Sequence, residues 1–335
     1  MRSLAVLLLT VGLSVCGREN GTEVFAEEPA KVTWKYEPRS LRPFWQGDTV
    51  EGESVLFIKN PVTGQARASV LFPLRKVLAV RNSAGNVTYL EGRDYKWKPG
   101  SREIVLPVGS RIVSRTPADL RRPADSQKYK LPHRDGKGDI FFGARLEYAE
   151  MQTCITYQHE PAAWKSPVPS FDVMVLPRSV HKLLNKQQLS IVVLGDSISA
   201  GANSSKLGKA PPFQPAYPEL LRLHLTSRFR KQVELTNLSV GGKDTGWALT
   251  QVDRVVGARP DLVILAFGMN DSAGRSVTEY RSNTRKLISL IREKNPETEF
   301  ILVASMLGNR DWTGLHHELF TGYRDALAEL CKPGI

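Results

Sequence analysis

The stretch "LSIVVLGDSIS", residues 189–199, decides the fold of the second half of this chain. Its first six residues are almost all apolar, which is typical of a strand buried on both faces of a parallel sheet. A Gly-Asp-Ser turn follows and places Ser197 just beyond the carboxyl end of that strand. Because open α/β sheets bind ligands at these strand ends, the position suits a nucleophile.

Strand-like and helical patterns alternate through the rest of this half. Further strands are expected at 232–239, 260–268 and 299–307, and helices at 216–229, 245–257, 276–296 and 315–331. Such alternation predicts a parallel sheet covered by helices on both faces. We therefore assign residues 187–335 to an α/β domain.

Three short blocks follow three successive strands of this pattern. They are "GDSIS" at 195–199, "NLSVGG" at 237–242 and "GMND" at 268–271. Each block alone is typical of a turn or a helix cap. Together they supply the Ser197 hydroxyl as a nucleophile, and the Gly242 N–H and the Asn270 amide as donors to a developing oxyanion.

In these three blocks the chain resembles the SGNH hydrolases, also called the GDSL esterase/lipase family. The resemblance covers about residues 187–335. It implies a flavodoxin-like three-layer αβα domain with neither a metal nor an organic cofactor. It also implies that Ser197 attacks an ester carbonyl while the N–H groups of Ser197 and Gly242 and the Asn270 side chain hold the oxyanion. Asp196 and Asp271 are expected to be structural, since carboxylates at helix starts accept free N–H groups.

The sequence departs from the family at its last block, a late Asp-x-x-His that supplies the base and its orienting acid. No histidine of this chain has an aspartate three residues before it; the six are His133, His159, His181, His224, His316 and His317. His316 and His317 follow Asp311 by five and six residues and open the last expected helix. They are weak candidates for the base.

The end of the sequence suggests where that block belongs. The last helix is followed by "KPG", a helix stop and turn, and in an alternating chain this turn should lead into another strand. We expect Ile335 to begin that strand and the catalytic His and Asp to lie beyond it. On this expectation the 335-residue chain is a fragment that lacks a competent base.

The first half of the chain reads differently. Short strand-like runs occur at 54–60, 68–73, 76–82, 103–108, 139–148 and 154–159, with polar turns between them and one long basic connection at 115–138. This pattern predicts an all-β, sandwich-like domain over 30–160. The proline-rich stretch "PAAWKSPVPSF" marks a linker over 161–186.

The amino-terminal residues predict export. A positive start and an apolar run too short to span a bilayer are typical of a signal peptide, here residues 1–26. We expect a secreted or periplasmic protein, with lipoprotein anchoring at Cys16 as the alternative and no membrane span. The formal charge of +12 is interpreted as a basic surface, since no nucleic-acid-binding motif accompanies it.

The resulting functional hypothesis is an exported ester hydrolase acting on a small-molecule or polysaccharide ester, with acetylated carbohydrate preferred. Trp34, Trp45, Tyr95 and Trp97 are candidates to stack on sugars, although core positions are the simpler interpretation. A lipase or other acylhydrolase is the alternative among enzymes. A catalytically inactive cell-surface ligand-binding protein is the alternative outside them. No cofactor, metal site or oligomeric state is indicated.

Overall fold

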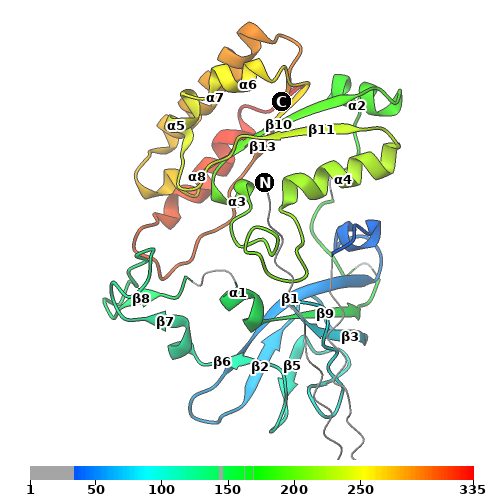
Figure 1. The fold of residues 1–335 in the computed structure, drawn as a ribbon, viewed down its shortest axis with the longest axis vertical. Helices are drawn as coiled ribbons and strands as arrows, with labels where there is room; N and C mark the ends of the chain where they lie inside the picture. Colours follow the sequence, from blue (N-terminus) through cyan, green and yellow to red (C-terminus); the bar gives the residue numbers. More distant parts are fainter. Residues whose placement is uncertain (1–33, 143–145, 162, 169) are drawn as a thin grey trace, which may run out of the picture. The chain divides into compact units, whose positions relative to one another are not determined.

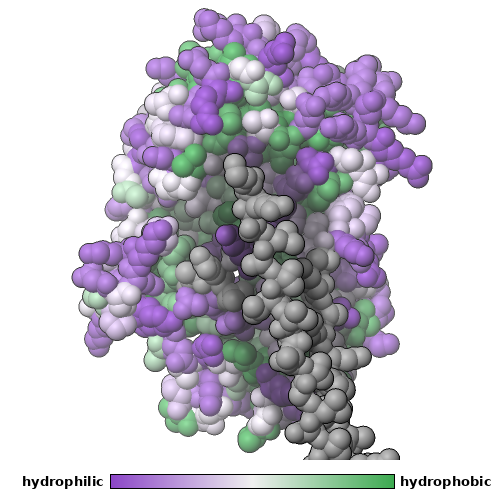
Figure 2. Space-filling model, in the orientation of Figure 1, coloured by the Kyte–Doolittle hydropathy of each residue, from purple (hydrophilic) through white to green (hydrophobic). Residues whose placement is uncertain are grey.

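The computed structural model describes residues 34–142, 146–161, 163–168 and 170–335. The expected signal peptide and Cys16 lie outside these ranges, so export and lipid anchoring stay predictions. Within the described ranges no helix has both the length and the apolar character that a bilayer crossing requires. The face shown in Figure 2 carries mainly hydrophilic residues with small apolar patches between them.

The second half of the chain contains a four-stranded sheet in which every pairing is parallel. The strand order is β11-β10-β12-β13, so the strand that leads to Ser197 is central. The bounds are β10 Leu189–Gly195, β11 Val233–Asn237, β12 Leu262–Ala266 and β13 Glu299–Val303. The sequence prediction of a parallel sheet is confirmed. β11, β12 and β13 each lie within the expected range and are shorter than that range.

Alternate residues of β10 enter two different cores, which explains why its sequence is apolar at nearly every position. Val192 and Leu194 pack in a cluster with residues of α5, α6, α7 and α8. Ile191 and Val193 pack in a second cluster with residues of α2 and α4. Figure 1 shows α7 and α8 on one side of the sheet and α4 on the other, which is the three-layer αβα arrangement. The helices are α2 Pro177–Leu184, α4 Tyr217–Phe229, α5 Thr245–Leu249, α6 Val252–Gly257, α7 Val277–Lys294 and α8 His317–Ala328.

Two details of this half differ from the expectation. The single helix expected over 245–257 is broken into α5 and α6, because the Thr250 hydroxyl donates to the Trp247 carbonyl at 2.7 Å at the end of α5. The predicted linker 161–186 contains α2, which begins at a proline and buries Leu183 against the sheet. The separate folding of 30–160 remains a prediction, which limited proteolysis between 160 and 187 would test.

The first half is rich in strands, as expected. Its main strands join through β1 into one sheet of order β3-β9-β1-β2-β5-β4, with β6 also paired to β1. Around this sheet lies an apolar core that includes Phe57, Ile104 and Ile155. The bounds are β1 Thr49–Lys59, β2 Ala66–Ser69, β3 Lys76–Asn82, β4 Lys96–Trp97, β5 Glu103–Leu106, β6 Ser114–Arg115 and β9 Gln152–Gln158.

The strand expected over 139–148 is wrong at residues 141, 142 and 146–148. Among the described residues of that range only β8, Asp139–Ile140, is a strand, and it pairs with β7, Arg121–Arg122. The later part of that range enters a helix, α1 Leu146–Met151. The 141–148 run mixes aromatic and apolar residues with Arg145 and Glu147, and such a short run does not distinguish a strand from one helical turn.

The connection between β7 and β8 contacts the loop that follows β13. The Arg134 N–H donates to the Asp311 carbonyl at 2.7 Å, and the Thr313 N–H donates to the Pro132 carbonyl at 3.1 Å. His133 lies between the carboxylates of Asp135 and Asp311, at 2.8 and 3.5 Å. The long basic connection at 115–138 therefore pairs with the loop that follows β13.

Short elements complete the chain: the 3-10 turns η1 Pro38–Leu41, η2 Pro117–Leu120 and η3 Asp271–Ala273, and the one-turn helix α3 Ser197–Ala200. After α8 the chain returns to the β13 edge, where the Phe300 N–H donates to the Gly334 carbonyl at 3.0 Å. Ile335 is buried in the α7–α8 core. Cys154 and Cys331 are both free thiols.

Candidate active site

Ser197 lies where the sequence placed it, at the first position of α3 directly after β10. The preceding Asp196 caps the helix, since its carboxylate accepts the Ile198 N–H at 2.9 Å. The Ser197 side chain is half-buried, and its hydroxyl forms no hydrogen bond with any residue that the structure describes. The hydroxyl is thus available at the carboxyl edge of the sheet.

Gly195 is required by the tight packing below this turn. A Cβ at Gly195 would lie 2.5 Å from Ser199 Oγ and 2.7 Å from the Ala266 carbonyl oxygen of β12. The backbone oxygen cannot move without breaking the pairing of β10 with β12. The glycine of the first block is therefore a steric necessity of the strand-to-helix turn.

We predict that Gly195→Ala lowers the free energy of unfolding by about 1–3 kcal/mol, the usual cost of overpacking. Urea denaturation followed by circular dichroism measures the change. Gly257→Ala in α6 is the matched control, because a Cβ there meets no atom within 4 Å and should leave stability unchanged or slightly raised. Equal stability of Gly195→Ala and the parent would contradict the steric argument.

The glycine block passes directly beside Ser197. The Val240 N–H donates to the Gly195 carbonyl at 3.1 Å, which fixes the loop to the end of β10. A Cβ at Gly241 would lie 3.6 Å from Ser197 Cβ, so the loop backbone runs against the serine. Gly242 is exposed and has a φ of +74°, in the left-handed region that glycine adopts without strain.

Asn237 holds this loop against α3. Its side-chain Nδ2 donates to the Ser199 carbonyl at 2.7 Å, and its Oδ1 accepts the Ser239 N–H at 3.1 Å. Asn237 is the first residue of the "NLSVGG" block, and the sequence pattern alone assigned it no role. An amide side chain at the last residue of a strand, ahead of a glycine turn, is the signal that marks such a loop-positioning residue.

Asn270 joins the third block to the second. Its Nδ2 donates to the Lys243 carbonyl at 2.9 Å, next to Gly242. An amide nitrogen carries two hydrogens, so a second N–H remains for another acceptor. The structure therefore brings the loops that carry Ser197, Gly242 and Asn270 together at one edge of the sheet.

Asp271 connects the loop after β12 with the start of α5 through buried hydrogen bonds. Its fully buried carboxylate accepts the Thr245 N–H at 3.0 Å, the Thr245 hydroxyl at 2.5 Å and the Gly268 N–H at 3.1 Å. Burial raises the pKa of Asp271, and the bonds from Thr245 oppose that rise. Burial also raises the pKa of Asp196, against the bond from Ile198. The Asp196 carboxylate accepts a backbone N–H, and the Asp271 carboxylate accepts two backbone N–H groups and a hydroxyl, which is the kind of bonding expected of structural carboxylates.

Residues 193–333 match the model of the GDSL-like Lipase/Acylhydrolase family. This part of the chain belongs to that family. No curated protein matches the sequence. The matched range contains all three blocks, so the resemblance inferred from them is confirmed, while the individual roles of Ser197, Gly242 and Asn270 stay predictions.

Several solved structures that are similar to part of this chain are described as esterases. The psychrotrophic esterase EstA from Pseudoalteromonas sp. is 17% identical, with a TM-score of 0.33 over 42% of this chain and 72% of that one. The SGNH-hydrolase family esterase AlinE4 is 24% identical, with a TM-score of 0.34 over 43% and 72%. A two-domain esterase (CEX) active on acetylated mannans is 17% identical, with a TM-score of 0.37 over 48% and 40%.

None of the six histidines, all of which lie in described ranges, hydrogen-bonds to Ser197. His316 Nδ1 lies 3.1 Å from Glu318 Oε1, and His317 Nε2 lies 2.9 Å from the Asn309 carbonyl oxygen. The His316 backbone N–H donates to the Ser272 carbonyl, which places the His316 backbone close in space to the Asn270 block. The partners of the other four are Asp135 and Asp311 for His133, Glu160 for His159, Asn185 for His181 and Tyr36 for His224.

The four sequence-selected aromatic residues do not form a stacking platform at this site. Tyr95 is buried and Trp97 packs against the core of the first half. Trp45 lies edge-on to Phe44, whose ring centroid is 4.9 Å away, and Trp34 lies edge-on to Tyr36 at 6.4 Å. Among the described residues no group of three or more His, Cys, Asp or Glu side chains is arranged to hold a metal ion.

Proposed function

We propose that this protein is an exported serine ester hydrolase that removes acetyl or other small acyl groups from carbohydrate esters. Membership of residues 193–333 in the GDSL-like lipase/acylhydrolase family supports acyl hydrolysis as the reaction class. The loops around Ser197, at 195–202, 237–243 and 268–275, consist mainly of small and polar residues, which favours a small acyl group. The apolar run in residues 1–26 supports export.

In the proposed reaction Ser197 Oγ attacks the ester carbonyl carbon while its proton passes to a base. The carbonyl oxygen becomes an oxyanion that accepts hydrogen bonds from the N–H groups of Ser197 and Gly242 and from the second N–H of Asn270. Collapse of this intermediate expels the alcohol, which takes up the proton, and leaves an acyl-serine. Water then attacks the acyl-serine and releases the carboxylic acid and free Ser197.

One observation carries the proposal: the three loops are connected before any substrate binds. The bonds from Val240 to Gly195 and from Asn270 to Lys243 connect the loops that carry the proposed donors, and no described residue hydrogen-bonds to the Ser197 hydroxyl. Donors fixed in advance need no rearrangement when charge develops, and this is the usual source of oxyanion stabilisation.

The test is covalent labelling of the full chain by a fluorophosphonate probe, which reacts with activated serines. Peptide mapping should find the label on Ser197 in the native protein and nowhere in heat-denatured protein. Release of acetate from acetylated xylan, compared with a long-chain p-nitrophenyl ester, then tests the acyl group and the alcohol. A folded protein that takes up no label would reject the enzymatic proposal.

A ligand-binding protein without catalysis is the second candidate, and the histidine contacts favour it. No histidine in the described ranges reaches the Ser197 hydroxyl, and a serine without a base is a weak nucleophile. This candidate predicts a bound carbohydrate ester that is recovered unchanged after long incubation, together with the absence of fluorophosphonate labelling.

We predict that His316→Asn and His317→Asn change the rate of Ser197 labelling less than about threefold. Their side chains bond to Glu318 and to the Asn309 carbonyl, so neither is committed to the serine proton. Labelling time courses of the two variants and of His181→Asn, a control on α2 at the opposite end of β10, measure the effect. A loss of about 10²-fold or more in one variant only would identify that histidine as the base.

A further inference from the structure

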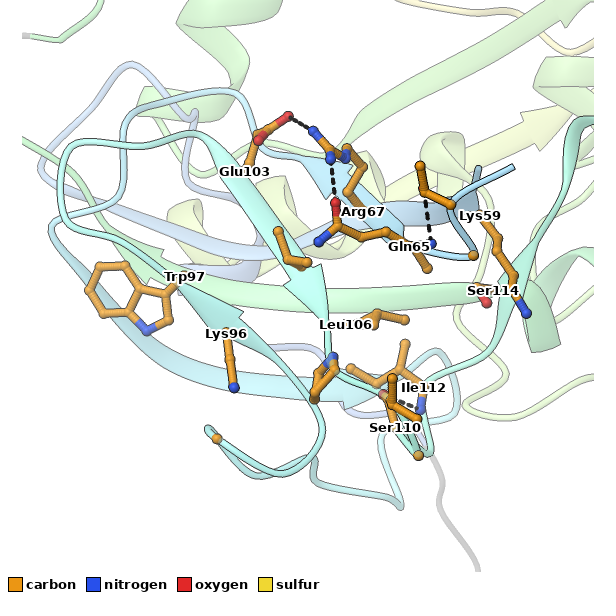
Figure 3. A pocket seen from close by; sticks show the side chains of 18 of the residues that line it. Lys59, Gln65, Arg67, Lys96, Trp97, Glu103, Leu106, Ser110, Ile112 and Ser114 are labelled. Atoms are coloured by element: carbon orange, nitrogen blue, oxygen red, sulfur yellow. Dashed lines mark hydrogen bonds and ion pairs between the residues drawn. The ribbon is translucent and has the colours of Figure 1, made fainter. Parts of the chain in front are cut away.

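A groove of about 1120 Å³ lies on the outer face of β2, β5 and β4 (Figure 3). Its lining residues all fall between Lys59 and Ser114, so it shares no residue with the candidate active site. The charged side chains that line it are exposed, and the groove is therefore open to solvent along the sheet. A site of this form suits an extended segment of a chain molecule.

The floor of the groove is the outward face of three paired strands. Val105 of β5 pairs with Arg67 of β2 on one side and with Lys96 of β4 on the other. Residues directly opposite one another in a sheet point to the same face, so these side chains form one row across the groove. Their sequence neighbours Ala68 and Ile104 point into the core instead.

The Arg67 guanidinium is held in place at one end of this row. Its Nη2 donates to Gln65 Oε1 at 2.5 Å, and its Nη1 lies 3.3 Å from Glu103 Oε1 (Figure 3). A guanidinium has five N–H donors in a rigid plane, and these two contacts leave donors free. Such a pre-oriented fork suits a planar anion such as a carboxylate.

The remaining charges make the groove cationic. Lys59, Lys96 and Lys98 form no ion pair with any residue in the described ranges, whereas Arg67 and Glu103 neutralise each other. Glu91 is the one further carboxylate of the lining. An anionic ligand is therefore attracted to this face.

The scarcity of aromatic rings in the lining indicates a polymer that is recognised by its charge rather than by stacking of its sugar rings. Trp97 is the single aromatic residue of the lining, and it packs against the core with a buried indole N–H. Stacking of sugar faces on exposed rings is thus not available as the main contact. Recognition must depend on charge and hydrogen bonding, which a polymer of acidic sugars provides.

We propose that this groove binds a segment of a carboxylate-bearing acidic polysaccharide. The proposal deepens the proposed function, in that it places a binding site for the ester-bearing polymer outside the catalytic domain. Binding itself requires no catalytic group, so the two proposals fail independently.

Affinity electrophoresis of the full chain carrying Ser197→Ala tests the binding without interference from hydrolysis. Polygalacturonate in the gel should retard this protein, and the same polymer with its carboxylates methyl-esterified should not. The double change Lys59→Gln and Lys96→Gln should weaken binding roughly 3–10-fold, since exposed ion contacts are individually modest. Glu91→Gln should tighten it, and added salt should weaken it.

The matched control removes the same two charges elsewhere. Lys286→Gln with Lys294→Gln, on exposed positions of α7, should leave retardation by polygalacturonate unchanged. Equal weakening in both double variants would show attraction to net charge alone and overturn the groove. Equal retardation by the esterified polymer would overturn the acidic polysaccharide as the ligand. Tighter binding of double-stranded DNA would do the same if that binding depends on Lys59 and Lys96.

Discussion

In a chain that supplies a competent base, replacing Ser197 with alanine is expected to abolish hydrolysis of p-nitrophenyl acetate, with a loss of at least about 10³-fold. Among the serines of the three blocks, Ser197 directly follows the central strand, whereas the Ser199 hydroxyl is bonded to Tyr217 and the Ser239 hydroxyl is buried. Removal of a nucleophile typically leaves only the residual catalysis of the oxyanion donors. The free energy of unfolding should change by less than about 0.5 kcal/mol, because no described residue hydrogen-bonds to this hydroxyl. Initial rates and urea denaturation measure the two quantities.

Ser204→Ala is the matched control for this variant. Ser204 lies in the next loop, where its hydroxyl accepts only a long hydrogen bond of 3.4 Å from the Leu207 N–H. Its removal should leave the rate within about twofold of the parent. Retention of most activity in Ser197→Ala would move the nucleophile elsewhere, and equal losses in both variants would point to a damaged loop.

The α/β half was predictable because its signals are local and repeated. β10 and β12 are apolar at nearly every residue, since alternate side chains enter the clusters on the two faces of the sheet. The same continuity fixes which edge of the sheet the following loops share, so the grouping of Ser197, Gly242 and Asn270 followed from their strand-end positions.

Features that depend on distant partners were not predictable in this way. The two-residue strands β4 and β6 exist only through pairing with β5 and β1, and their own residues carry no strand pattern. The contact of Arg134 with Asp311 joins loops far apart in the sequence. The role of Asn237 was likewise hidden, because its partner is the Ser199 carbonyl of another loop.

Asn270→Ala is expected to lower kcat by about 10²–10³, equivalent to about 2.7–4 kcal/mol of transition-state stabilisation, with less than about threefold change in KM. One N–H of the amide is committed to the Lys243 carbonyl, which orients the side chain, and the other is free for the oxyanion. The ester carbonyl in the ground state carries little charge, so the lost bond matters mainly in the transition state.

Loss of the Lys243 bond is the competing explanation for such a defect, and Asn283→Ala controls for it. The Asn283 amide donates to Thr245 Oγ1 at 3.2 Å, within the same network but outside the three blocks, so its removal perturbs the loop support without touching the oxyanion. This variant should lose less than about threefold in kcat. The Ser197 labelling rate adds a second discriminating readout, because the phosphonyl oxygen also becomes charged in that reaction. Asn270→Ala should slow the labelling, and Asn283→Ala should not. A rise in KM with kcat preserved would assign Asn270 to substrate binding, and equal kcat losses in both variants would assign it to loop support.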